Sequence, residues 1–293
     1  MKLLFIYNPR AGKAKIRSNL LDIIDIFTKA GFVVTAYPTQ ATGDATGVLA
    51  RVKANSYDLI VCCGGDGTLV EVVGGMVRQK LNIPLGYIPA GTTNDFARNL
   101  RISPNMITAA ERICRRHTFA CDIGYLNEEN FVYIAAFGLF TDVSYATSQD
   151  VKNVIGHTAY ILEGMKRLPD MKVCRMRVIS EGIDFEEDFI FGMVTNSISV
   201  GGFKHLTGKR VKLDDGLFEV TLIKMPKSPM ELNSMMAAVI TRNYNTEYMY
   251  SFKTEKIDFI SAEEIPWTID GEFGGQYRKA TIRNVKQAIE IIC

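Results

Sequence analysis

Residues 61–73 read VCCGGDGTLVEVV, and this stretch decides how the first part of the chain folds. A run rich in β-branched residues ends at GGDGT and a segment of helical character begins there, so the sequence predicts a strand-to-helix turn. A sharp turn needs one or two glycines, but this turn has three, with a carboxylate among them and a hydroxyl directly after. The pattern therefore indicates a backbone kept clear of side chains so that a ligand can approach it.

The segments on both sides of this turn alternate between strand and helix patterns. The predicted strands are 3–8, 33–38, 58–63 and 83–89, and the predicted helices are 18–32, 42–56, 68–80 and a segment near 104–116. Such alternation predicts an α/β domain with a mostly parallel sheet and helices on both faces. Ligands of such folds bind beyond the carboxyl ends of the strands, which here carry NPRAGK, PTQATGD, GGDGT and PAGTTND.

The pattern changes after about residue 118. Strand-like segments then follow one another with short turns between most of them, and helical patterns are confined to about 150–168 and 228–243. This predicts a second domain, most simply an antiparallel β-sandwich or barrel. We therefore divide the chain into an α/β domain, residues 1–118, and a β-sandwich domain, residues 119–293.

The composition is that of a soluble globular protein, with 47% hydrophobic and 23% charged residues in a chain of 293. A net charge of +2 predicts no strong field for nucleic acid. The six cysteines lack the spacing of a metal site and indicate reduced thiols in a cytosolic protein. The apolar run at 3–7 is too short for a signal peptide, and no stretch approaches the roughly 20 apolar residues that cross a bilayer. Contact with lipid would therefore be made at the membrane surface.

Two further turns carry polar residues to the same edge of the predicted sheet. NPRAGKAK (8–15) follows the first strand, and its backbone amides and lysines form either a phosphate cradle or an ordinary solvated turn. PAGTTNDFAR (89–98) could be a plain capped helix start, but its place at the edge that also carries GGDGT favours binding. Asp66 would repel a phosphate, so we expect it either to hold Mg²⁺ or a water on it, or to cap the helix.

In this order and spacing, NPRAGK, GGDGTLVEVV and GTTNDFAR resemble the diacylglycerol kinase catalytic family, in particular its bacterial soluble lipid kinases. The GGDG turn is also similar to that of NAD kinases and phosphofructokinases. Two later segments, KLDDGLFEV (212–220) and TIDGEF (268–273), resemble the D-G-L/F and DGE segments of the family. The resemblance runs from residue 8 to about residue 275.

The resemblance implies an N-terminal α/β domain of the NAD kinase/phosphofructokinase type, a C-terminal antiparallel β-sandwich, and ATP in the cleft between them. It implies nucleotide contacts at Asn8, Pro9, Arg10, Ala11, Gly12, Thr39, Gly65, Asp66, Gly67, Thr68, Leu69, Val70, Glu71 and Thr92. It also implies a Mg²⁺ held by Asp215 and the backbones of Lys212 and Leu217, and linked through water to Asp122 and Asp66. The family commonly has asparagine where Val70 and Gly74 stand, so this chain lacks one polar contact near the phosphates.

The second domain offers carboxylates in two Asp-Gly turns. Asp-Gly is a common hairpin signal, so the turns at Asp215 and Asp270 could both be purely structural. A kinase that phosphorylates an alcohol, however, needs a carboxylate that orients the hydroxyl and accepts its proton. Asp66 and Asp95 belong with the phosphates, which leaves Asp270 or Glu272. We place Asp270 first because it directly follows the stiff IPWTI strand, whereas Glu272 has the longer reach.

We therefore expect an ATP- and Mg²⁺-dependent lipid kinase of phospholipid metabolism, cytoplasmic and peripheral to the membrane, that phosphorylates the hydroxyl of a diacylglycerol-like or related lipid. Its expected partners are the lipid alcohol and, transiently, a membrane surface, but no nucleic acid; an edge strand could pair across a homodimer. One alternative is a kinase of a soluble acceptor, of the NAD or sugar-phosphate type, which the DDGL and DGE segments disfavour. The other is a non-catalytic nucleotide- or lipid-binding regulator, which Val70 favours and the retention of both GGDGT and DGE disfavours.

Overall fold

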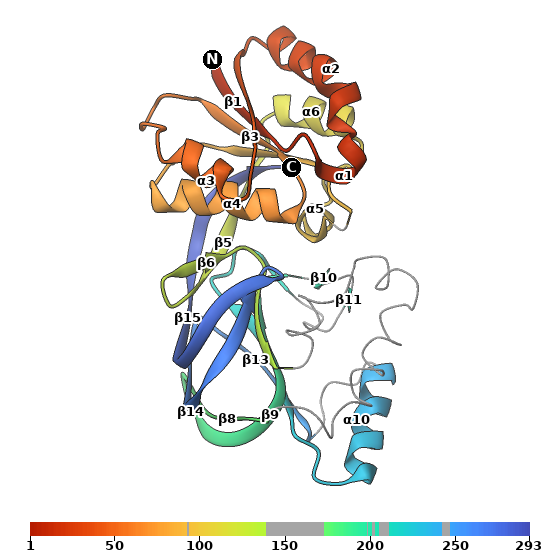
Figure 1. Cartoon of the computed structure of the whole chain (residues 1–293), viewed down its shortest axis with the longest axis vertical. Helices are drawn as coiled ribbons and strands as arrows, with labels where there is room; N and C mark the ends of the chain where they lie inside the picture. The colour runs from red at the N-terminus through yellow and green to blue at the C-terminus, as the bar shows by residue number, and fades with distance from the viewer. Residues whose placement is uncertain (93, 139–172, 198, 201–202, 205–210, 242–246) are drawn as a thin grey trace. The chain divides into compact units, whose positions relative to one another are not determined.

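The computed structural model of the chain describes residues 1–92, 94–138, 173–197, 199–200, 203–204, 211–241 and 247–293. The chain divides into two compact units (Figure 1). The first unit comprises Met1–Ile123 together with Lys286–Cys293, and the second comprises Gly124–Val285. The helix expected at about 150–168 lies outside the described residues.

The first unit is built on parallel strands. They are β1 (Lys2–Tyr7), β2 (Val33–Pro38), β3 (Leu59–Gly64) and β4 (Leu85–Pro89). Their order is β4-β3-β1-β2, and every pair in this series is parallel. All six residues of β3 are buried, which is typical of a central parallel strand with helices on both faces.

In the described part of this unit, six helices connect and cover these strands. They are α1 (Ala11–Ala14), α2 (Ile16–Lys29), α3 (Asp44–Leu49), α4 (Asp66–Arg78), α5 (Asp95–Asn99) and α6 (Met106–Cys114). The helix expected at 68–80 begins at Asp66, so the aspartate of GGDGT is its first residue and Gly65 is its N-cap. The helix expected at 42–56 ends already at Leu49, and Asn55 has a positive φ that a continuing helix does not allow.

The end of the chain belongs to the first unit, although the sequence assigns residues 119–293 to the second domain. The last strand, β15 (Glu272–Ile292), begins in the second unit and ends beside β4. There Ile291 and Ile292 pair in parallel with Leu85 and Gly86, and both isoleucine side chains are buried. The apolar end of β15 therefore covers an edge of the parallel sheet that would otherwise be open.

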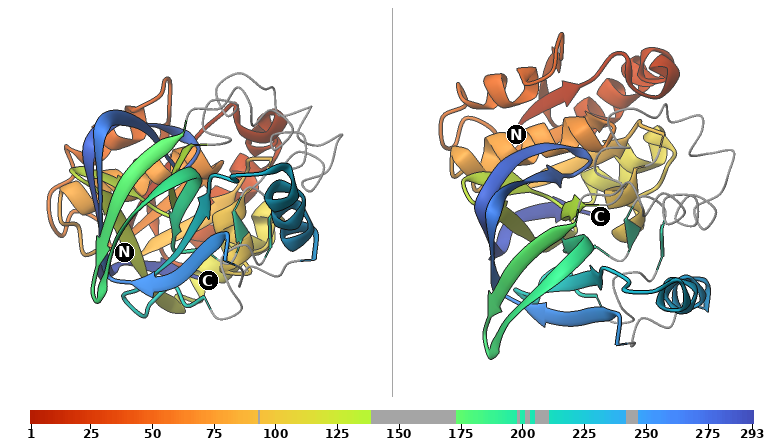
Figure 2. Two further views of the ribbon diagram at one scale, coloured as in Figure 1. Left: turned by 90° about the horizontal axis from the view of Figure 1, so that it is seen from below. Right: turned by 60° about the horizontal axis from the view of Figure 1, so that its bottom comes forward.

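The second unit consists mainly of antiparallel strands. They are β6 (Glu129–Phe131), β7 (Ile134–Gly138), β8 (Cys174–Ser180), β9 (Ile183–Thr195), β10 (Ser199–Val200), β11 (Phe203–Lys204), β12 (Phe218–Lys224), β13 (Met249–Thr254) and β14 (Lys256–Ile269), together with most of β15 and the last part of β5 (Thr118–Leu126). One helix, α10 (Pro229–Thr241), lies within the described part of this unit. The β8–β9 hairpin and the β14–β15 hairpin appear as long curved ribbons in Figure 2.

Two long strands join the layers of this unit. β9 pairs with β8 along its first part and with β7 along its last part, and β14 does the same. The register of β14 with β15 shifts between Ile260 and Ile265. Such shifts are the usual way in which a strand passes from one layer to the next. The antiparallel layers therefore share two strands and are not two separate sheets.

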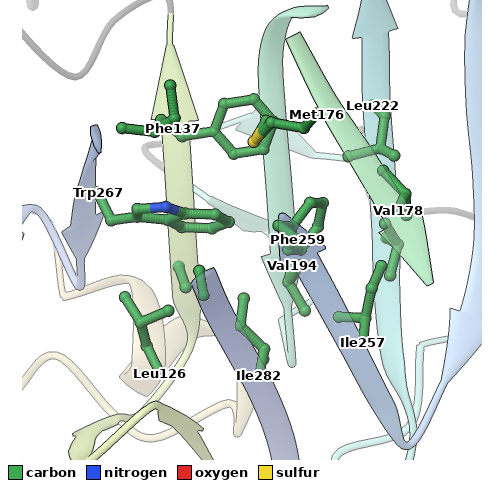
Figure 3. Close-up of a cluster of buried hydrophobic side chains, with 14 of the residues drawn as sticks. Leu126, Phe137, Met176, Val178, Val194, Leu222, Ile257, Phe259, Trp267 and Ile282 are labelled. Carbon is green, nitrogen blue, oxygen red and sulfur yellow. The ribbon is translucent and has the colours of Figure 1, made fainter. Parts of the chain in front are cut away.

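An aromatic cluster fills the space between these strands (Figure 3). The rings of Phe137 and Trp267 have centroids 4.9 Å apart, and the rings of Phe259 and Trp267 have centroids 5.1 Å apart. Trp267 is 1% exposed and lies three residues before Asp270. The core therefore fixes the end of β14, from which the DGE turn projects.

Candidate functional site

Three polar loops of the first unit lie side by side at the carboxyl ends of β1, β3 and β4. The N–H of Asn8 donates to the carbonyl of Cys63 over 2.9 Å, and the N–H of Ala90 donates to the carbonyl of Gly64 over 2.7 Å. Thr39 follows β2 at the same edge, where its N–H donates to the carbonyl of Tyr7. The structure therefore brings the NPRAG, GGDGT and PAGTTND segments together, as the parallel order of the strands requires.

Most glycines of these loops are needed for the loops to pack on one another. A Cβ atom on Gly12 would lie 1.8 Å from the carbonyl oxygen of Ala90, and one on Gly65 would lie 3.3 Å from the Cα of Gly91. Gly67 differs, because none of the described atoms beyond its neighbours would come within 4 Å of its Cβ. The sequence predicts that the backbone is clear for a ligand along all of GGDGT. Of its glycines, Gly64, Gly65 and Gly67, only Gly67 has open space where a Cβ would lie.

Asp66 holds the neighbouring loop through its carboxylate. Its Oδ2 atom accepts a hydrogen bond of 3.3 Å from the N–H of Asp95, the first residue of α5. Its Oδ1 atom is buried and has no hydrogen-bond partner among the described residues. Burial raises the pKa of Asp66, against the opposing effect of the Asp95, Phe96 and Asn94 N–H groups. Asp66 is thus a carboxylate with one oxygen committed to the fold and one oxygen available to a cation.

Glu71 also serves the fold through its side chain. Its carboxylate accepts hydrogen bonds from the N–H groups of Gly43, over 2.8 Å, and Ala45, over 3.3 Å, at the start of α3. Its backbone carbonyl accepts a third bond from the hydroxyl of Thr46. A carboxylate at this place satisfies free N–H groups of the helix N-terminus. The predicted nucleotide contact at Glu71 would therefore have to compete with a helix cap.

The other predicted nucleotide residues differ in what their side chains can offer. Asn8 donates to the hydroxyl of Thr68 over 3.4 Å and accepts the N–H of Arg10 over 2.9 Å, so these residues form one connected loop. Leu69 is 1% exposed and packs in the core. The remaining residues are solvent-exposed or half-buried at the loop surfaces, and they are Pro9, Arg10, Ala11, Val70 and Thr92.

Asp122 has a partner in the C-terminal strand. It is 0% exposed, and its Oδ1 atom accepts a hydrogen bond of 2.8 Å from the N–H of Gln287. Among the described residues, no group of three or more His, Cys, Asp or Glu side chains is arranged to hold a metal ion. The predicted link through water from Asp215 to Asp66 and Asp122 therefore stays a prediction.

The DGE turn of the second unit is a tight hairpin in which Asp270 is the anchor. Its carboxylate accepts hydrogen bonds from the N–H groups of Val132, Tyr133 and Ile134 over 2.7, 2.9 and 3.1 Å. Asp270 and Gly271 form a two-residue loop with positive φ at both positions, the conformation that Asp-Gly favours in hairpins. The side chain of Asp270 is therefore buried and fully engaged in holding the turn.

Glu272 lies on the other side of this hairpin and is exposed. It pairs with Ile269 as the first residue of β15. Because the hydrogen bonds of Asp270 hold the turn in place, the backbone that carries the exposed carboxylate of Glu272 is rigid. Of the two acids that the sequence puts forward, Glu272 is the one whose carboxylate can reach a ligand from solvent.

The second acidic turn, at Asp215, lies at the same end of this unit. Strand register connects the two turns, because Asp270 donates its N–H to Ile134, Ile134 pairs with Thr195, and Thr195 pairs with Glu219 of β12. Asp215 lies three residues before β12, and its Oδ1 atom accepts the N–H of Leu217 over 3.1 Å. The structure thus brings together the two second-domain segments that the sequence singles out.

Two charged residues beside Asp215 were missed by the sequence reasoning. Lys253 of β13 lies 3.3 Å from Asp215 and 2.8 Å from Glu219, measured from Nζ to the carboxylate oxygens. Burial raises the pKa of Glu219 to about 7, although Lys253 opposes the shift. A single acid inside the apolar run LFEVTLI was the available signal for Glu219. Lys253 gave none, because its role depends on the register of β12 with β13.

Comparisons with known proteins agree on one group. The family model for the diacylglycerol kinase catalytic domain matches residues 2–126. The diacylglycerol kinase of Staphylococcus carnosus is 36% identical over 289 residues, which cover 98% of this chain and 93% of the relative. The diacylglycerol kinase of Staphylococcus saprophyticus is 34% identical over 288 residues, with the same two coverages. A crystal structure from Bacillus anthracis, provisionally described as a diacylglycerol kinase, matches with a TM-score of 0.82 and 26% identity, covering 99% of this chain and 94% of that one.

Proposed function

The chain belongs to the diacylglycerol kinase family, and from this premise we propose that it transfers the γ-phosphoryl group of ATP to the hydroxyl of a diacylglycerol-like lipid. The family assignment confirms the resemblance seen in the sequence and makes the chain a lipid kinase, a phosphotransferase with an alcohol acceptor. The soluble-acceptor kinase and the non-catalytic regulator are not favoured, because relatives named as diacylglycerol kinases match nearly the whole chain.

The observation that carries the proposal for ATP is the open backbone at Gly67. Gly67 lies in the first turn of α4, and a helix N-terminus combines free N–H groups with the positive end of the helix dipole. Thr68 and Asn8 add short polar side chains at the same edge. We assign the nucleotide phosphates to this turn, with Asn8–Gly12, Thr39 and Thr92 around it. Leu69 and Glu71 support the turn, since their side chains are committed to the core and to α3.

The residues around Asp215 fit a divalent cation. Carboxylate and backbone carbonyl oxygens are the donors that Mg²⁺ prefers, and Asp215 already attracts a cation, the ammonium group of Lys253. Asp215 with the carbonyls of Lys212 and Leu217 would hold the ion, and the link through water from Asp215 to Asp66 and Asp122 that the family resemblance implies stays a prediction. When bound, Mg²⁺ supplies positive charge that offsets the negative charge of the phosphates.

We assign the role of proton acceptor to Glu272 in place of Asp270. The carboxylate of Asp270 already accepts three backbone N–H bonds and is buried, so it has little room to approach an acceptor hydroxyl. The exposed Glu272 has free access to an acceptor hydroxyl and stands on the turn that Asp270 fixes. Asp270 is then a positioning residue, and Glu272 takes the hydroxyl proton.

The acceptor lipid would be met at a membrane surface. No helix in the described part of the chain combines the length and the apolar character needed to cross a bilayer. We propose a cytoplasmic protein that contacts the membrane transiently, and a homodimer through an edge strand is a further expectation.

The test is phosphoryl transfer from radiolabelled ATP in mixed micelles. Diacylglycerol should become labelled in the presence of Mg²⁺, whereas NAD and a sugar phosphate, offered as soluble acceptors, should not. Labelling of a soluble acceptor at a comparable rate would contradict the lipid assignment. Labelling of no acceptor, by a protein that binds ATP, would favour the regulator instead.

A further inference from the structure

Lys253 lies between two carboxylates of the second unit. Its Nζ atom is 2.8 Å from Oε1 of Glu219 and 3.3 Å from Oδ2 of Asp215. Glu219 and Lys253 are direct partners in the antiparallel pair of β12 with β13. The contact is therefore built into the strand register and does not depend on a chance approach of two long surface side chains.

This pair of acids needs a cation because it is partly buried. The side chain of Glu219 is 7% exposed and that of Asp215 is 22% exposed, whereas that of Lys253 is 35% exposed. Neighbouring carboxylates repel one another, and burial removes the water that would screen them. A positive charge at this position stabilises the fold, and either an ammonium group or a metal ion can supply it.

The ammonium group of Lys253 and a divalent metal ion would both bind Oδ2 of Asp215. The N–H of Leu217 occupies Oδ1, and Lys253 contacts Oδ2, so a divalent ion bound by this carboxylate must displace the ammonium. Lysine carries its charge on a flexible stem, which allows it to leave Asp215 while it keeps Glu219. We propose that Lys253 is a built-in competitor for the divalent cation at Asp215. It keeps the affinity of this site for Mg²⁺ low and keeps the turn folded when no metal is bound.

This inference rests on the proposed metal assignment at Asp215, and it makes Glu219 a further ligand only when Lys253 is absent. Without Lys253, the two carboxylates would have no ion-pair partner among the described residues. Two carboxylates bind Mg²⁺ or Mn²⁺ better than one. Removal of the lysine should therefore create a tighter metal site and, at the same time, make the fold depend on the metal.

The experiment measures Mn²⁺ binding to the full chain by electron paramagnetic resonance, and Mg²⁺ binding by calorimetry, both without nucleotide. Lys253→Met should bind either ion about tenfold or more tightly than the wild type, the effect expected for removing one nearby like charge. Lys253→Arg keeps the charge and should bind as the wild type does. Lys256→Met removes an exposed lysine three residues away and is the control for net charge. Lys253→Met combined with Glu219→Gln, or with Asp215→Asn, should lose the gained affinity.

A second measurement covers the case in which Lys253→Met folds poorly. Its melting temperature should rise on addition of MgCl₂ and fall in EDTA, whereas the wild-type value should change little. The inference is overturned if Lys253→Met binds no tighter than Lys256→Met, or if neither ion restores its fold. Lipid kinase activity of the wild type is assayed separately, so that a failure of this inference is distinguished from a failure of the proposed function.

Discussion

Gly65 and Gly91 face one another so closely that a Cβ atom on Gly91 would lie 2.7 Å from the Cα of Gly65. Two loops that are far apart in the sequence thus meet backbone to backbone at the carboxyl ends of β3 and β4. A substitution at either glycine therefore disturbs the packing of the protein before any ligand is considered. For this reason Gly67, and not Gly65, is the position that tests nucleotide binding.

Gly67→Ala should lower the affinity for ATP about tenfold or more while it leaves the fold intact. The added Cβ meets no described atom beyond its chain neighbours and the adjacent backbone of α4, but it would occupy space that we assign to the phosphates. Calorimetry with ATP and urea unfolding measure the two effects. Gly47→Ala is the matched control, because it also lies in a helix with open space around its Cβ. Equal ATP affinities for the two variants would place the phosphates elsewhere.

Glu272→Gln should slow the chemical step by about 10²–10⁴-fold, the usual contribution of a general base. Its free energy of unfolding should stay within about 0.5 kcal/mol of the wild type, because the side chain is exposed. The KM for ATP should be unchanged. Steady-state kinetics with diacylglycerol in mixed micelles provides the rate, and a full wild-type rate would remove Glu272 from the mechanism.

Asp270→Asn should mainly cost stability, by about 2–3 kcal/mol. The amide cannot accept all three backbone N–H groups as the carboxylate does, and hydrogen bonds to a charged group contribute more than neutral ones. Urea unfolding should therefore shift for Asp270→Asn but not for Glu272→Gln. The opposite pattern, a stable Asp270→Asn protein without activity, would return the role of base to Asp270.

Glu71→Ala should loosen α3 at a cost of about 1–2 kcal/mol, the range found for lost helix caps. The Gly43 and Ala45 N–H groups donate to the carboxylate of Glu71, and both hydrogen bonds are lost when this residue is alanine. Amide hydrogen exchange should accelerate at these two residues and not in α6. Glu111→Ala, at an exposed position of α6, is the control. Unchanged exchange at Gly43 would contradict the capping role.

Trp267→Ala should destabilise the second unit by about 3–5 kcal/mol, as expected for a large aromatic side chain removed from a core. The ring is 1% exposed and packs against Phe137 and Phe259. The near-UV circular dichroism of the remaining aromatic side chains, recorded during urea unfolding, measures this loss of stability. Leu21→Ala, at a position 80% exposed, should change the free energy of unfolding by less than about 0.5 kcal/mol.

The local part of the fold could be predicted from the sequence. The strand expected at 58–63 is found at Leu59–Gly64, and the one expected at 33–38 has those bounds, because short apolar runs between turn residues are a local signal. Because the carboxyl ends of parallel strands lie at one edge of a sheet, the positions of the strands also predict that the polar loops meet there. Sequence reasoning therefore reached the family and the main loops.

What remained out of reach depends on contacts between distant residues. Asp270 meets N–H groups 136 to 138 residues away, and only those contacts show that its carboxylate anchors the turn. Glu71 was expected at the nucleotide but caps a helix 25 to 28 residues upstream. Lys253 reaches Asp215 only through the register of two strands. In each case the residue type indicated a polar role, but the sequence did not indicate which distant residue would be its partner.

The path of β15 has a consequence for the order in which the chain can fold. During synthesis β1 to β4 emerge well before Ile291 and Ile292, which pair with β4. The first unit therefore cannot complete its sheet until these two residues have emerged, and the edge of β4 stays unpaired until then. A product truncated before Ile291 would expose that edge to other proteins in the cell.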